Sequence, residues 1–110
     1  MQIGPLQYVT VVSGATLSSV FAFARSERVG MMVPNVDSSG LFIQAAPRSN
    51  DTFARITDVF TGSLNWLRTL TSSQTLAVDL SDHVRAFGVA RAEFSVAQTD
   101  TRTLTIVGKA

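Results

Sequence analysis

The chain contains no cysteine and only one histidine among its 110 residues. Disulfide bonds and thiolate metal sites are therefore excluded, so packing and subunit contacts have to stabilise the fold. No run of about twenty apolar residues occurs, and the sequence predicts no membrane-spanning helix. With 45% hydrophobic residues, the chain can build one compact core, and we expect residues 1–110 to form a single domain.

Charged residues are also scarce, at 15% of the chain, and the formal net charge is +1. The nine Lys and Arg residues and the eight Asp and Glu residues are scattered along the sequence. Binding to nucleic acid or to an anionic membrane surface requires clustered cations. Neither kind of partner is therefore expected.

Helix-length periodic segments are missing, and short runs of Val, Ile, Thr, Phe and Leu alternate with Gly, Pro, Asn, Asp and Ser. This pattern is typical of short strands joined by turns. About eight strands are predicted in an all-β, two-sheet β-sandwich that is jelly-roll-like or immunoglobulin-like in its connections. Residues 1–13 hold either an N-terminal arm or the first strand. The predicted strands are residues 6–12, 15–23, 28–33, 41–46, 53–60, 77–80, 87–94 and 102–107.

The second predicted strand, residues 15–23, alternates clearly in hydropathy. Leu17, Ser19, Phe21 and Phe23 lie on one side of it and are predicted to face the core.

Three connecting segments carry their own signals. Turn-forming residues 48–51 lie between two apolar segments and predict a hairpin. Residues 81–85 favour one helical turn with Ser81 as its N-cap. Residues 61–76 are rich in Thr and Ser, and we expect a long loop or a distorted hairpin there.

The single histidine, His83, is the first place to look for catalysis. It follows Asp82, and an Asp-His pair could act with Ser81 or a distant serine as nucleophile. Adjacent residues of a strand point to opposite faces, however, and no Gly-x-Ser-x-Gly motif occurs. A surface or turn-stabilising role is favoured for His83, and the chain is not predicted to be an enzyme.

The carboxylates stand mostly alone at predicted turns. Asp79 and Asp82 are the nearest pair, and bound calcium at that corner is the alternative to a capping or turn-closing role. No spacing singles out a pair for glycoside hydrolysis, and the glycines are too isolated to form a phosphate loop. No catalytic, cofactor-binding or metal-binding residue is therefore assigned.

The only tryptophan, Trp66, lies between Asn65 and Leu67 in the uncertain segment. It can be a core residue, an anchor in a protein interface, or a platform that stacks on a sugar ring. The last interpretation would make the chain a carbohydrate-binding module with a glycan ligand. As interface candidates the sequence suggests Phe60, Trp66, Leu67 and Arg68.

Several motifs recur in a fixed order along the chain. They are an early Gly-x-x-Leu-Ser segment, an apolar strand that ends in proline, a Leu-Phe-Ile-Gln strand, a polar hairpin leading to Phe, an Asp-Val-Phe strand, a Val-Asp-Leu-x-Asp corner and a closing Gln-x-Asp-x-Arg-Thr-Leu-Thr-Ile-Val strand. In this sequence they occupy residues 14–19, 29–34, 41–44, 50–53, 58–60, 77–82 and 98–107. In this order they resemble a group of small virion proteins of tailed bacteriophages.

The resemblance implies a jelly-roll-like sandwich that acts as a structural part of a virion. The implied role is a capsid cement or decoration protein, or a neck or tail component, assembled in the host cytoplasm and probably trimeric in form is replaced here by the firmer expectation of a homotrimer. Its implied partners are the major capsid protein or other virion proteins. The hairpin at residues 47–51 and the segment 64–68 depart from the pattern, which leaves the partner surface open.

Overall fold

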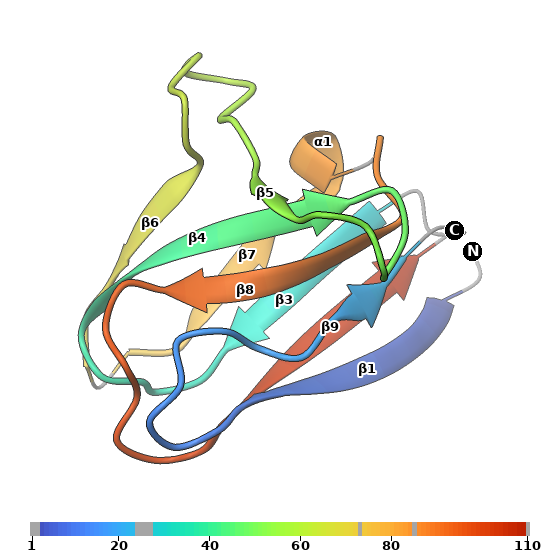
Figure 1. Cartoon of the computed structure of the whole chain (residues 1–110). Helices are drawn as coiled ribbons and strands as arrows, with labels where there is room; N and C mark the ends of the chain where they lie inside the picture. Colours follow the sequence, from blue (N-terminus) through green and yellow to red (C-terminus); the bar gives the residue numbers. More distant parts are fainter. Residues whose placement is uncertain (1–2, 24–27, 73, 85, 110) are drawn as a thin grey trace.

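A computed structural model describes residues 3–23, 28–72, 74–84 and 86–109 of the chain. In these ranges the chain forms short strands and one helical turn (Figure 1). In chain order the elements are β1 (Ile3–Val11), β2 (Phe21–Ala22), β3 (Arg28–Val33), β4 (Ser39–Ala46), β5 (Ala54–Arg55), β6 (Leu67–Leu70), β7 (Leu76–Asp79), α1 (Ser81–Val84), β8 (Val89–Phe94) and β9 (Arg102–Lys109).

The strands form two antiparallel sheets that pack face to face (Figure 1). The first sheet has the order β1-β9-β3-β7, and the second has the order β2-β8-β4-β5, with β6 also paired to β4. Because β6 pairs with residues 39–42 of β4 and β5 pairs with residues 44–45, these two short strands are halves of one interrupted edge strand.

Counting that edge as one strand gives a simple pairing rule. The first strand pairs with the last, the second with the next to last, and so on inward to β4 and its edge. This is a long hairpin rolled up into a sandwich, the connection of a jelly roll. The predicted all-β, two-sheet, jelly-roll-like fold is confirmed.

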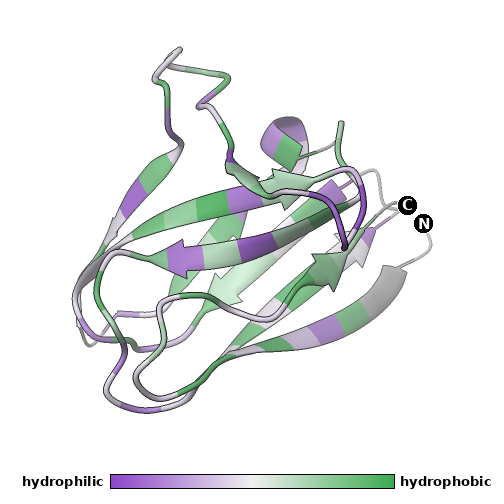
Figure 2. Cartoon of the chain, in the orientation of Figure 1, coloured by the Kyte–Doolittle hydropathy of each residue, from purple (hydrophilic) through white to green (hydrophobic). Residues whose placement is uncertain are grey.

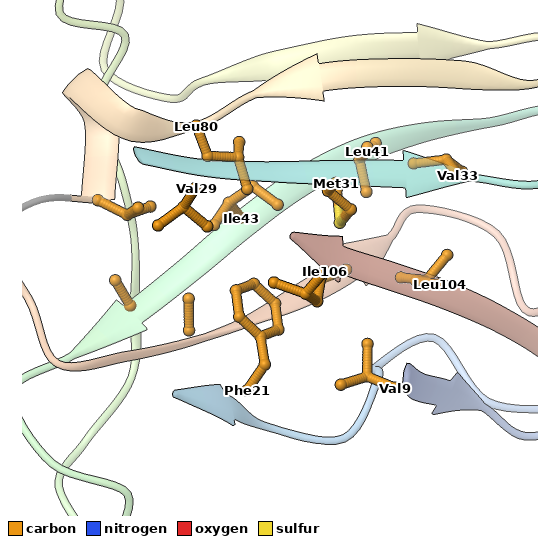
Figure 3. Close-up of a cluster of buried hydrophobic side chains, with 14 of the residues drawn as sticks. Val9, Phe21, Val29, Met31, Val33, Leu41, Ile43, Leu80, Leu104 and Ile106 are labelled. Atoms are coloured by element: carbon orange, nitrogen blue, oxygen red, sulfur yellow. The ribbon is translucent and has the colours of Figure 1, made fainter. Parts of the chain in front are cut away.

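The core lies between the two sheets and is built by period-two burial. In β9, Leu104 and Ile106 are buried while Thr103 is exposed, so one face of the strand is covered and the other is wet. Figure 3 shows Phe21 and Met31 pointing into the same cluster as Ile106. Packing of these aliphatic and aromatic side chains stabilises a chain that has no disulfide bonds.

One side of the sandwich is closed by side chains that bridge the sheets. The Gln7 carboxamide of β1 accepts a hydrogen bond from the Ala22 N–H (3.2 Å) and donates one to the Ala22 carbonyl. Beside it, the Ser19 N–H donates to the Thr10 carbonyl (3.0 Å), and the Thr10 N–H donates to the Ser19 hydroxyl (3.1 Å). These contacts satisfy part of the outer edge of β1.

Most predicted strands are confirmed. The strand predicted at residues 28–33 has the bounds of β3, and five others correspond to β1, β4, β7, β8 and β9 within a few residues at each end. The predicted hairpin is present between β4 and β5, where the Asp51 N–H donates to the Arg48 carbonyl (3.1 Å). Residues 3–11 form a first strand instead of a free arm.

The prediction for residues 15–23 is wrong in part. Only Phe21 and Ala22 form a strand, although Leu17 adds an isolated bridge to Glu93. Phe21 is buried as predicted, but Leu17 is exposed and Ser18 is buried. The Ser18 hydroxyl accepts a hydrogen bond from a backbone N–H of β8 (2.9 Å), which turns that residue inward in place of its neighbour.

The strand predicted at residues 53–60 is also mostly wrong, because only Ala54 and Arg55 pair with β4. The chain then leaves the sheet and returns as β6, a strand that was not predicted inside residues 61–76. The distorted-hairpin alternative fails as well, since β6 and β7 belong to different sheets.

The helical turn is confirmed as α1, but Ser81 is not its cap; Arg85 lies outside the described residues. The Leu80 carbonyl accepts the N–H groups of His83 (3.0 Å) and Val84 (3.1 Å), which makes Leu80 the capping position. The Ser81 hydroxyl is engaged elsewhere, where it accepts a hydrogen bond from the Val29 N–H of β3 (2.9 Å).

Candidate functional site

The interruption between β5 and β6 creates a loop that projects from the sandwich (Figure 1). We call residues 57–65 the apolar loop. Its base is closed by two backbone hydrogen bonds, from the Ile56 N–H to the Ile43 carbonyl (2.9 Å) and from the Trp66 N–H to the Ile56 carbonyl (2.8 Å). The loop therefore starts and ends at residues fixed to the core.

Large hydrophobic side chains are exposed along this loop. Phe60 is 73% exposed and Leu64 is 84% exposed, and Val59 is also exposed. Figure 2 shows the hydrophobic positions in green along the projecting segment. Leu67 of β6 and Phe87 after α1 are exposed next to the same region. A cluster of this kind is typical of a surface that contacts another macromolecule.

Asp58 organises the loop from within. Its Oδ1 atom accepts the N–H groups of Phe60 (3.0 Å) and Thr61 (3.2 Å). Its own N–H donates to the Ser63 carbonyl (3.0 Å), and its carbonyl accepts the Gly62 N–H (2.9 Å). Gly62 has a φ of 74°, a left-handed conformation that favours glycine. The tight turn holds the neighbouring apolar side chains outward.

Asp58 is also joined to the body of the protein. The buried His83 side chain of α1 places Nε2 at 3.5 Å from Asp58 Oδ1. Phe60 meets the imidazole edge-on at 5.3 Å between ring centroids, and Trp66 does so at 6.0 Å. Arg68 lies 3.6 Å from Asp58 Oδ2, and its guanidinium stands 4.4 Å from the Trp66 ring centroid.

These contacts set the ionisation of the loop carboxylate. Burial by itself raises the pKa of Asp58. The N–H groups of Phe60 and Thr61, together with His83, stabilise the charged form and outweigh burial. The pKa of Asp58 is therefore lowered from its ordinary value of 3.8, and the carboxylate is charged at neutral pH.

Two hollows flank the apolar loop. One, of ≈ 320 Å³, is lined by Val59, His83 and Phe87 among others. The other is open and shallow, ≈ 740 Å³, and is lined by Leu64 and Leu67 among others. A partner that binds the loop can therefore place apolar groups on both of its sides.

Of the interface candidates from the sequence, Phe60, Leu67 and Arg68 lie around Asp58 at the surface. Trp66 does not, because it is fully buried in the core and its Nε1 has no hydrogen-bond partner in the described part of the chain. The core interpretation of this residue is the one observed. Contact of the other three with a partner stays a prediction.

Sequence reasoning missed Asp58 and misplaced His83. His83 is buried, so the surface role is wrong, while its contact with Asp58 is a stabilising one. The signal for Asp58 was present in the Asp-x-x-Thr-Gly spacing of residues 58–62, which is typical of an Asp-stabilised turn. The carboxylate facing His83 comes from a different loop and is remote in sequence.

The corner proposed for calcium has a simpler structure. The Asp79 carboxylate accepts the Ser81 N–H at 2.9 Å, and this bond lowers the pKa of Asp79. No group of three His, Asp or Glu side chains that could hold a metal ion occurs within the described ranges. In the same ranges, no helix is long and apolar enough to cross a membrane.

The outer face of the second sheet bears on the carbohydrate alternative. Arg55 covers the Phe42 ring at 3.8 Å from its centroid, and Arg91 covers the Phe53 ring at 4.4 Å. Arg55 is held there by Glu93, with 2.7 Å between Nη2 and Oε2. These ring faces are therefore occupied by guanidinium groups, and the buried Trp66 offers no platform for a sugar.

Comparison with protein-family models, with curated proteins and with solved structures finds no match to this chain.

Proposed function

We propose that this protein is a structural component of a tailed-phage virion, a capsid cement or decoration protein that binds through the apolar loop. It acts by protein–protein contact and not as an enzyme. Its partner is the major capsid protein or another virion protein. The order of sequence motifs supports the virion setting, and the jelly-roll connection of the strands is compatible with it.

The apolar loop is the observation that carries the proposal. Exposed Phe60 and Leu64 lose favourable free energy in water and regain it only when a partner covers them. The loop is already ordered by Asp58 and its contact with His83. Because the loop is preorganised, binding does not have to fix its conformation, and more of the burial free energy appears as affinity.

The surroundings of the loop have the anatomy of a binding surface. Apolar side chains at the tip are bordered by the polar residues Thr61, Ser63 and Asn65 and by the cation Arg68. An apolar centre with a polar rim is the usual arrangement in reversible interfaces. We expect Phe60 and Leu64 to supply most of the affinity and the rim to supply orientation.

The test is co-sedimentation of the purified protein with capsids assembled from the major capsid protein of the same phage. The double variant Phe60→Ser with Leu64→Ser is expected to weaken binding at least about tenfold, because each substitution removes about 1 kcal/mol or more of buried apolar contact. The control is Val20→Ser, an exposed apolar residue on the β1–β2 connection.

Unchanged binding by the double variant would assign the contact to another surface. No association of the wild-type protein with capsids, necks or tails would contradict the virion proposal. Binding to necks or tails alone would replace the decoration role with a position at that part of the virion.

A further inference from the structure

The outer face of the first sheet lacks charge across its middle. Register places Tyr8 beside Thr105, Thr105 beside Met32, and Met32 beside Ala77. These four residues form one row across all four strands of the sheet. Tyr8 and Met32 are exposed large side chains, at 66% and 42%.

The adjacent row continues the same character. Leu6 pairs with Val107, and Val107 pairs with Gly30; Leu6 is exposed. We call these two rows the uncharged face. Charged residues border it in the described chain at one end, where Asp79 pairs with Gly30 and Arg28 pairs with Lys109.

The other sheet shows how this protein treats a face that meets water. Its outer surface carries Gln44, Arg55, Arg91 and Glu93, joined by hydrogen bonds from Gln44 to Glu93 (2.8 Å) and from Arg91 to Gln44 (2.7 Å). A solvated face of an antiparallel sheet usually has polar residues of this kind. The uncharged face departs from that rule within the same molecule.

We propose that the uncharged face is buried against a second copy of this chain. A partner with charges at the contact would lose their hydration and find no counter-charge among Tyr8, Thr105 and Met32. A second copy brings a surface that is equally free of charge, so no like charges are forced together. The apolar loop projects from the opposite sheet (Figure 1) and stays available for a different partner.

The size of the face predicts how strong the contact is. Four strands about 4.8 Å apart and about six residues long, at about 3.3 Å per residue, give a flat footprint of about 400 Å². Stable complexes bury about 800 Å² of accessible surface per partner. We therefore expect a reversible, concentration-dependent assembly, and three copies with this face turned toward a common axis would give the homotrimer that the resemblance implies.

The experiment is molecular mass by light scattering over a range of protein concentrations. The wild-type mass is expected to rise above that of the monomer as concentration increases. Thr105→Lys places a charge in the centre of the face and is expected to remain monomeric at concentrations where the wild type is associated. Thr69→Lys, the same change on an exposed position of β6 in the other sheet, is the control and should associate as the wild type does.

Thermal unfolding of each variant checks that the fold is intact, and Met32→Lys replaces Thr105→Lys if that variant is unfolded. A wild-type protein that is monomeric at every concentration, or folded face variants that associate normally, would overturn the inference. The virion proposal is tested separately, since the folded Thr105→Lys monomer retains the apolar loop.

Discussion

His83 Nε2 lies 3.5 Å from Asp58 Oδ1, which joins the one helical turn of the fold to the loop that projects from its sheet edge. The two residues are far apart in sequence, and the aromatic rings of Phe60 and Trp66 pack edge-on against the imidazole. The contact explains why a loop with an exposed apolar tip can keep one conformation. It also makes Asp58 the residue on which the loop structure depends most.

Asp58→Ala is predicted to loosen the apolar loop without abolishing the sandwich. The N–H groups of Phe60 and Thr61 lose their acceptor, so their hydrogen exchange should become faster. Asp58→Asn keeps an acceptor oxygen and should protect both amides better than alanine does. Amide exchange followed by NMR is the measurement, and equal exchange rates in wild type and Asp58→Ala would show that the carboxylate does not hold the loop.

Glu93 is predicted to make stability depend on acid pH. The hydrogen bond from Arg55, opposed by burial and assisted by Gln44, leaves the pKa of Glu93 below its ordinary value of 4.5. A lowered folded-state pKa stabilises the protein above about pH 4.5, and this contribution is lost as pH falls through the folded-state pKa. Urea unfolding at several acid pH values should give a smaller slope for Glu93→Gln than for wild type.

Arg55→Met tests the cause of that shift. It removes the main partner of Glu93 but leaves the carboxyl in place, so the slope below about pH 4.5 should again be smaller than in wild type. An unchanged slope in both variants would mean that other carboxyls account for the acid sensitivity. Asp37, whose pKa is lowered by hydrogen bonds from Thr99, is the next to test.

Gly88 is predicted to tolerate no side chain. A Cβ atom at this position would overlap the Pro47 carbonyl oxygen, so Gly88→Ala should lower the free energy of unfolding by about 1–3 kcal/mol. The matched control is Gly30→Ala, where a Cβ would lie 3.5 Å from the Val78 carbonyl oxygen, an ordinary contact. Denaturant unfolding of the two variants is the measurement, and equal stability would contradict this account of Gly88.

The strands were predictable because alternating or continuous apolar runs and turn residues are local signals. β3 and β9 carry such runs with a turn on either side, and both were found. β6 was not, because Leu67–Leu70 is short, half exposed and follows a polar segment; its pairing depends on β4, which is remote in sequence. Tertiary pairing decided that segment, and local propensity did not.

The candidate site divides in the same way. Phe60, Leu67 and Arg68 could be suggested as surface residues because they lie in a segment rich in Thr and Ser. The contact between Asp58 and His83 could not, because it joins two turns that come together only after the sandwich has formed. Gln98 is a second case: it is buried and accepts the Asp37 N–H at 2.9 Å, and nothing in its local sequence marks it.

Trp66 provides the most direct optical test of the structure, since it is the only tryptophan in the chain. The ring is fully buried, so its fluorescence should be emitted at shorter wavelength than in the urea-unfolded chain and be quenched little by acrylamide. Trp66→Ala should lower the free energy of unfolding by about 3–5 kcal/mol through lost burial and the cavity that remains. Leu64→Ala, an exposed position in the apolar loop, should change it by less than about 0.5 kcal/mol. Strong acrylamide quenching of the native protein would instead place Trp66 at the surface and return it to the interface candidates.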